Sequence, residues 1–139
     1  DRLRRAVEPL QAVIFIQDAV RLAALDRLAL DPLVWRGREL LAPCFRAAVA
    51  GTTGSGDCTI AGMLAALLHD LDPVEVLIMA LGVGGCSVES PDATSGVPLW
   101  DAVRARIAGG WPHHPLTVNL DGWRNDGGPV WFGPDDPGR

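Results

Sequence analysis

The sequence contains no lysine and no tyrosine, and all 12 of its basic residues are arginines. The absence of lysine excludes a Walker-type phosphate-binding lysine, a Schiff base and a lysine general base. Any phosphate clamp must therefore use arginine or the backbone. The 3 cysteines include no CxxC pair, which argues against a disulfide framework and favours a reducing, cytoplasmic location. The longest apolar run, Val76 to Val88, is glycine-rich and shorter than the roughly 20 residues that cross a bilayer, so we expect no membrane association.

Charge and length exclude further classes. With 12 basic and 17 acidic residues the net charge is −5, which makes nucleic acid an improbable partner. A chain of 139 residues that is 48% hydrophobic and 21% charged predicts one globular domain. It begins with Asp1 rather than Met, which we expect of a cleaved, truncated or incompletely predicted product.

The N-terminal third predicts an α/β architecture. A helix ending near Leu10 is expected to feed a buried strand over Ala12–Ile16. Residues Asp18–Leu33 are ambiguous, because alternating apolar residues favour strands in a hairpin whereas the alanine and leucine content favours a helix. We favour the hairpin. Trp35–Phe45 is a further extended candidate.

Three helices are predicted in the middle of the chain. The first covers Cys58–His69, follows a glycine-rich loop and is expected to be buried through one apolar stripe formed by Ile60, Met63, Leu64, Leu67 and Leu68. The second begins at Asp72-Pro-Val-Glu75, a capping box with proline in the first turn. Its stripe comprises Val74, Leu77, Ile78 and Leu81.

The second helix continues into Gly82-Val-Gly-Gly-Cys86, where close packing or a ligand is expected to justify the glycines. The third helix is predicted over Pro98–Ala108, with Trp100, Val103 and Ile107 on one face. Residues 111–139 are rich in Gly, Pro and Asp, and they predict an irregular tail lying partly on the body formed by residues 1–110. We expect residues 134–139 to be disordered.

The glycine-rich loop Gly51-Thr-Thr-Gly-Ser-Gly-Asp57 is the strongest chemical signal. A loop that opens a helix presents unpaired N–H groups at the positive end of the helix dipole, where an oxyanion or phosphate fits. A carboxylate beside such an anion hole, here Asp57, is suited to act as a general base. Together these are the components of a hydroxyl kinase, although the same pattern is also typical of an ordinary well-capped helix.

The stretch Gly51-Thr-Thr-Gly-Ser-Gly-Asp-Cys-Thr-Ile-Ala-Gly62 resembles the C-terminal signature of the ribokinase-like (PfkB) family of carbohydrate kinases. The similarity extends to the helix beginning at Asp72, to Ala80–Val88 and to Ser95–Pro98, where the family closes its nucleotide pocket. The resemblance implies the C-terminal portion of a ribokinase-like α/β fold, with strands followed by helices packed on a sheet. It also implies ATP with Mg²⁺ as cofactors and a sugar or sugar-like alcohol as substrate.

Roles carry over by position. Asp57 resembles the catalytic base that takes the proton from the sugar hydroxyl. The backbone of Gly54, Ser55 and Gly56 resembles the anion hole for the transferred phosphoryl group. The resemblance also assigns four residues to cofactor binding, namely Thr52 and Thr53 before the hole and Gly82 and Gly85 near the adenine. No residue of this chain is assigned to a metal.

The chain departs from the family in its signature and in its length, among other respects. The family usually opens the signature with Asp, often a ligand of an activating monovalent cation, and this chain has Gly51. Family members are also roughly twice as long, so we expect this chain to be a nucleotide-binding, catalytic-loop half that lacks the N-terminal half. The alternative is a non-catalytic nucleotide-binding module, or an interaction fragment that self-associates or is completed by another chain.

Other reactive side chains are expected to be structural. Cys58 at a helix start is not expected to be a nucleophile, and Cys44, Cys58, Cys86 and His69 lack the ligand spacing of a zinc site. His113 and His114 are expected in a solvated loop. Arg36 and Arg38 are expected to pair with surface carboxylates rather than a phosphate. The tryptophans at 111, 123 and 131 are expected to pin the tail to the core.

Overall fold

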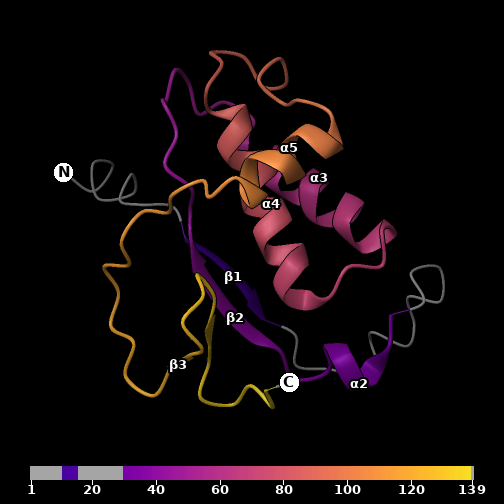
Figure 1. The fold of residues 1–139 in the computed structure, drawn as a ribbon, viewed down its shortest axis with the longest axis vertical. Helices are drawn as coiled ribbons and strands as arrows, with labels where there is room; N and C mark the ends of the chain where they lie inside the picture. The colour runs from indigo at the N-terminus through magenta and orange to yellow at the C-terminus, as the bar shows by residue number, and fades with distance from the viewer. Residues whose placement is uncertain (1–10, 16–29, 139) are drawn as a thin grey trace.

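The computed structural model describes residues 11–15 and 30–138 (Figure 1). Helices and an antiparallel sheet form two layers, and α4 contacts both the sheet and the helices α3 and α5. This confirms the predicted α/β class with helices packed on a sheet. The elements are β1 (Gln11–Phe15), α2 (Pro32–Trp35), β2 (Glu39–Pro43), α3 (Ser55–Leu68), α4 (Pro73–Ser87), α5 (Trp100–Ala108), β3 (Arg124–Asn125) and β4 (Trp131–Phe132).

The sheet has the order β1-β2-β4-β3, and every neighbouring pair is antiparallel. Strand β1 confirms the predicted strand over residues 12–15 and begins one residue earlier, whereas Ile16 lies outside the described residues. Strand β2 lies within the predicted extended segment, but Trp35 at the start of that segment belongs to α2. The predicted hairpin lies mostly outside the described residues. For its last residues the prediction of a strand is wrong, because Pro32 and Leu33 are helical. Asp31 explains the helix, since its side chain caps the backbone N–H of Leu33 at 2.9 Å.

The segment 111–138 contributes two short strands to the sheet. Strand β4 pairs with β2 through Leu40↔Phe132 and Leu41↔Trp131, and β3 pairs with β4. The predicted disorder of the final stretch is wrong for residues 134–138, because Asp136 is buried. Its carboxylate lies 3.4 Å from Arg38 Nε and accepts the N–H of Glu39 at 2.8 Å. The boundary proposed at residue 110 stays a prediction.

Helix α4 is the centre of the core. The capping box at its start is confirmed: Asp72 accepts the N–H of Glu75 at 2.9 Å, and Glu75 accepts the N–H of Asp72 at 3.2 Å. The predicted four-residue stripe is too narrow, since most of the helix is buried. The reason is that the sheet, α3 and α5 cover α4 from different sides, as Figure 1 shows. Among the described residues, no helix reaches the length and apolarity needed to cross a bilayer.

The predicted apolar stripe of α3 is confirmed for Leu67, and Met63 is partly buried against the core, but the stripe is wrong at its other positions. Ile60, Leu64 and Leu68 are exposed, whereas Cys58, Gly62, Ala66 and Leu67 form the buried face. This face is made mostly of small residues because α3 packs closely on α4: a Cβ atom added to Gly62 would come within 2.8 Å of the Val83 Cβ. The apolar side chains of Ile60, Leu64 and Leu68 therefore lie on the outer side.

The third predicted helix is confirmed as α5, which begins two residues later than predicted and ends at Ala108 with Gly109 as its C-cap, and Val103 is buried. After it, Trp111 lies in the core and stacks on Phe45 with 4.5 Å between ring centroids. This confirms that Trp111 pins the segment to the body. The expectation that His113 lies in a solvated loop is wrong, because its ring packs against Phe45 at 4.0 Å and its Nδ1 lies 2.7 Å from the Pro43 carbonyl oxygen.

Candidate functional site

The glycine loop leaves the sheet region along a short backbone ladder. The N–H groups of Ala50 and Gly51 both donate to the carbonyl oxygen of Val88, at 2.8 and 3.2 Å. The loop then turns at Thr52, whose carbonyl oxygen accepts the backbone N–H of Ser55 at 3.2 Å and its hydroxyl at 3.0 Å. Gly54 takes a left-handed conformation with φ of 74°, which a residue with a side chain rarely adopts. The chain thereby reverses into α3.

Helix α3 begins three residues earlier than the sequence predicted, at Ser55. Its N-cap, Gly54, has no side chain to satisfy the first turn, and Cys58 N–H is the first to reach back, to the Gly54 carbonyl at 2.8 Å. Within the part of the chain that the structure describes, the N–H groups of Gly56 and Asp57 have no acceptor. These donors at the positive end of the helix dipole are suited to hold an anion.

Asp57 lies in the same first turn, with its side chain exposed. Space beside it is open, because a Cβ atom built on the neighbouring Gly56 would meet nothing within 4 Å. The structure therefore brings together the predicted base and the predicted anion-hole residues Gly54, Ser55 and Gly56 in one turn. Thr52 and Thr53 precede them and are exposed. An accessible carboxylate beside free N–H donors is chemically suited to proton abstraction next to a bound oxyanion.

A second loop packs against the glycine loop. A Cβ atom on Gly54 would approach the Ala93 Cβ to 2.7 Å, and one on Gly51 would approach the backbone of Pro91 to 3.0 Å. The thiol of Cys58 donates to the Ala93 carbonyl at 3.0 Å. These contacts place the end of α4 and the residues after it directly beside the candidate site, next to the segment Ser95–Pro98 that the resemblance assigned to the nucleotide pocket.

Asp92 shapes this second loop, and sequence reasoning missed it. Its Oδ1 accepts the N–H groups of Thr94 at 3.0 Å and Ser95 at 2.7 Å. Hydrogen bonds from Ser95, then Thr94, lower the pKa of the Asp92 carboxyl below its ordinary value. An Asp whose side chain accepts the N–H groups two and three residues later is typical of a turn, and this signal in the sequence could have identified Asp92.

Gly82 and Gly85, predicted to lie near an adenine, are part of the helix packing. A Cβ atom on Gly82 would come within 2.8 Å of Ile107, and one on Gly85 within 2.9 Å of the Trp111 ring. Close packing against α5 and Trp111 thus accounts for both glycines without a ligand. They do not lie in the turn that holds Asp57, and their assignment to nucleotide binding stays a prediction.

The remaining reactive side chains form no second centre. All three cysteines are free, and burial raises the pKa of the Cys44 thiol to about 11, which disfavours its thiolate. In the described ranges, no group of three His, Cys, Asp or Glu residues is arranged to hold a metal ion. The expected surface pairing of Arg38 is wrong, since Arg38 is 6% exposed and pairs with the buried Asp136.

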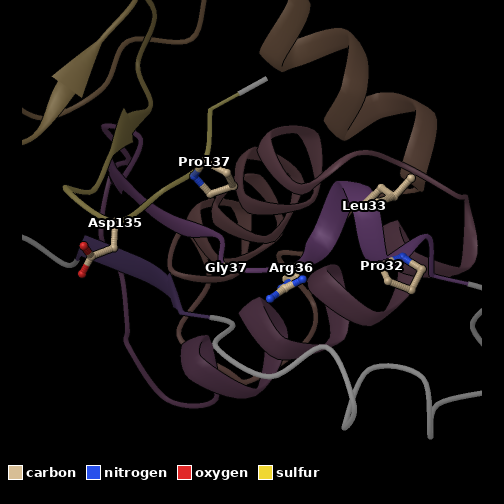
Figure 2. Close-up of a pocket in the computed structure, with 6 residues that line it drawn as sticks. All are labelled: Pro32, Leu33, Arg36, Gly37, Asp135 and Pro137. Atoms are coloured by element: carbon tan, nitrogen blue, oxygen red, sulfur yellow. The ribbon is translucent and has the colours of Figure 1, made fainter.

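Figure 2 shows a groove between α2 and the C-terminal segment. The labelled side chains of Arg36 and Asp135 stand apart on its two sides. None of the predicted site residues lines this groove, and the candidate site is the glycine loop. The lining residues are Pro32, Leu33, Arg36, Gly37, Asp135 and Pro137.

Comparisons with known proteins found a family model and a solved structure that are similar to the chain. Residues 31–100 match the model of the family described as pfkB family carbohydrate kinase, a range that contains the glycine loop, α3 and α4. A ribokinase from Thermotoga maritima, known from its crystal structure, is similar at 25% sequence identity with a TM-score of 0.45. The similarity covers 51% of this chain and 27% of that ribokinase, so the chain spans about a quarter of its length. No curated protein sequence matches the chain.

Proposed function

Because the chain belongs to the pfkB family of carbohydrate kinases, whose model matches half of it, we propose that it carries the phosphoryl-transfer site of an ATP-dependent sugar kinase. The acceptor is a hydroxyl group of a sugar or sugar-like alcohol. The observation that carries the proposal is the first turn of α3, where an exposed carboxylate lies beside two N–H groups that have no acceptor among residues 11–15 and 30–138.

The anion hole is the first part of the proposal. The left-handed turn at Gly54 leads into the helix start, and the space where a Gly56 side chain would lie is open. In phosphoryl transfer the protein acts mainly through positioning and charge stabilisation, so backbone donors fixed at a helix start are well suited to the task. The chain has no lysine to do this instead.

Asp57 is the second part. As general base its carboxylate accepts the proton of the acceptor hydroxyl while the oxygen attacks the phosphoryl group. The helix dipole favours a negative charge at this place in the first turn. The leaving group is the nucleoside diphosphate.

The described residues of this site offer groups that suit the phosphates of ATP but no cluster of ligands for Mg²⁺. The N–H groups of Gly56 and Asp57 are the donors that would hold the terminal phosphate, and Thr52 and Thr53 lie beside them with exposed side chains. The described residues contain no three-carboxylate or histidine cluster for a metal. We therefore propose that Mg²⁺ enters with the phosphates, whose charge it neutralises when bound.

The test is a calorimetric titration of the chain with ATP and Mg²⁺, followed by assays of ADP release with a panel of sugars. We expect saturable ATP binding, and we expect Asp57→Asn to leave ATP affinity nearly unchanged while it abolishes any turnover. Asp101→Asn is the matched control, because Asp101 is an exposed carboxylate in the first turn of α5. Turnover retained by Asp57→Asn would contradict the role of the base.

Absence of ATP binding by the chain would overturn the proposal for this polypeptide. ATP binding with no turnover by the unsubstituted chain would instead favour a nucleotide-binding module. Sedimentation separates the remaining possibility, an interaction fragment, since that reading requires self-association or a second polypeptide.

A further inference from the structure

The side chains of Glu89 and Arg106 form a two-pronged ion pair outside the glycine loop. Arg106 Nη1 donates to Glu89 Oε2 and Nη2 donates to Oε1, both at 2.7 Å. Such a fork-to-fork arrangement fixes the relative orientation of the two groups as well as their separation. The pair joins α5 to the residues that follow α4.

Trp111 holds the guanidinium from another side. The Arg106 Cζ lies 3.5 Å from the centroid of the Trp111 ring, in cation–π contact. The same indole donates its Nε1–H to the carbonyl oxygen of Arg46 at 2.6 Å. Arg106 is therefore held by a carboxylate and an aromatic ring, and both of these partners contact the segment that leads into the glycine loop.

Hydrogen bonds hold the backbone of the segment 46–51 at several positions. Arg46 is held by Trp111, and Ala50 is held by the Val88 carbonyl, which also accepts the N–H of Gly51. Ala48 lies between these residues and contacts Glu89. The pKa of the Glu89 carboxyl is lowered mainly by the Arg106 hydrogen bonds and to a smaller extent by the backbone N–H of Ala48. Because Glu89 directly follows Val88, the ion pair and the backbone ladder act on the same stretch of chain.

We propose that Arg106 is a positioning residue for the glycine loop: through Glu89 it fixes residues 48–51 and thereby sets where the N–H groups of the α3 start lie. The inference rests on the proposed function. Arg106 touches neither Asp57 nor the loop donors in the contacts described above, so it acts through Glu89 and Val88. The physical expectation is that loosening this anchor broadens the distribution of loop positions and weakens the hold on a phosphate group.

Three variants test the proposal. Arg106→Ala removes both hydrogen bonds to Glu89. Arg106→Lys keeps the positive charge but cannot form the two parallel hydrogen bonds of a guanidinium. Arg104→Ala removes a guanidinium that is exposed on the same helix, and it is the matched control. Circular dichroism establishes that each variant is folded, and Arg106→Lys keeps the test possible if Arg106→Ala does not fold.

The first measurement is amide hydrogen exchange, which needs no ligand. We expect exchange at Ala50 and Gly51 to accelerate in Arg106→Ala, to accelerate less in Arg106→Lys, and to stay unchanged in Arg104→Ala. Amides in the middle of α4 serve as the internal reference, since a general loss of stability would accelerate them too. Unchanged exchange at Ala50 and Gly51 in Arg106→Ala overturns the proposal.

The second measurement compares ATP with adenosine by calorimetry in the presence of Mg²⁺. We expect Arg106→Ala to weaken ATP about tenfold, as the loss of one charge-assisted contact does, and to leave adenosine affinity within about twofold. Equal weakening of both ligands would indicate a merely structural role. An unsubstituted chain that binds no ATP would contradict the proposed function, and the exchange measurement would then decide the positioning role alone.

Discussion

Gly62 of α3 lies directly against Val83 of α4, so that a Cβ atom in place of the Gly62 hydrogen would meet the Val83 Cβ at 2.8 Å and its Cγ2 at 2.9 Å. Both contacts are shorter than real Cβ atoms tolerate, and Val83 is buried. The close approach of these two helices is what places the first turn of α3 beside the residues that follow α4.

Gly62→Ala is therefore expected to destabilise the protein. The added methyl group forces α3 away from α4 at a cost of about 1–3 kcal/mol, more than the ~1 kcal/mol that alanine gains in helix propensity. Urea denaturation followed by circular dichroism measures the change. Gly56→Ala is the control, because that Cβ atom would meet nothing within 4 Å. Equal stabilisation by the two substitutions would mean that the helices do not pack this closely.

Neighbouring leucines on α3 test which side of the helix is buried. Leu67 is 8% exposed and Leu68 is 71% exposed. We expect Leu67→Ala to lower the free energy of unfolding by about 2–5 kcal/mol and Leu68→Ala by less than about 0.5 kcal/mol. Thermal unfolding of the two variants side by side is sufficient. A loss for Leu68→Ala as large as that for Leu67→Ala would instead support the stripe that the sequence predicted, which contains both leucines.

The C-terminal segment offers a similar pair. Asp136 is buried against Arg38, whereas Asp135 is exposed. Asp136→Ala leaves a buried guanidinium without its partner, which we expect to cost about 3–5 kcal/mol, and Asp135→Ala to change stability by less than about 0.5 kcal/mol. Denaturant unfolding measures both. Equal stability of the two variants would show that residues 134–138 contribute nothing to the fold.

Stability is expected to depend on pH through Glu89. Hydrogen bonds from Arg106 lower the pKa of this carboxyl in the folded state, so its contribution is present above the unfolded pKa of about 4.3 and is lost as the pH falls through the lower folded value. Glu89→Gln is expected to remove this part of the acid dependence. Unfolding free energies of both proteins between neutral and acidic pH, compared point by point, should converge at low pH. A constant difference would contradict the prediction.

Monovalent cations are expected to have little effect. The space beside Gly51 is closed by the backbone of Pro91 at 3.0 Å, so the carboxylate that relatives often present to a cation has no room here. On the proposed function, ATP affinity in potassium and in tetramethylammonium buffers of equal ionic strength should differ by less than about twofold. A tenfold increase with potassium would show that the cation is held by other groups.

Local signals in the sequence predicted the local structure. The capping box at Asp72 and the glycine after Ala108 specify helix ends through contacts within a few residues, and both are observed. The loop residues 54–57 were predicted for the same reason, since a glycine turn and a helix start are local features. The residue types alone were sufficient to place Asp57 at a helix start, although the helix begins three residues earlier than predicted.

Long-range contacts could not be predicted in this way. The outer apolar side of α3 satisfies the helical period as well as the inner side does, and only the glycine of one helix meeting the valine of another decides between them. The β3 and β4 strands have two residues each, too few for an alternating pattern. The partner of Arg38 lies near the opposite end of the chain, and no spacing rule connects the two.

The glycines of α4 have a consequence for how sequences of this kind diverge. Gly82 faces Ile107 of α5, Gly84 faces Thr59 of α3, and Gly85 faces the Trp111 ring. Each glycine and its neighbour share one volume, so a larger residue at 85 requires a smaller one at 111. Related sequences should therefore change such positions in pairs. Substitutions of the α4 glycines should be found only together with substitutions at the facing residues of α3, α5 and position 111.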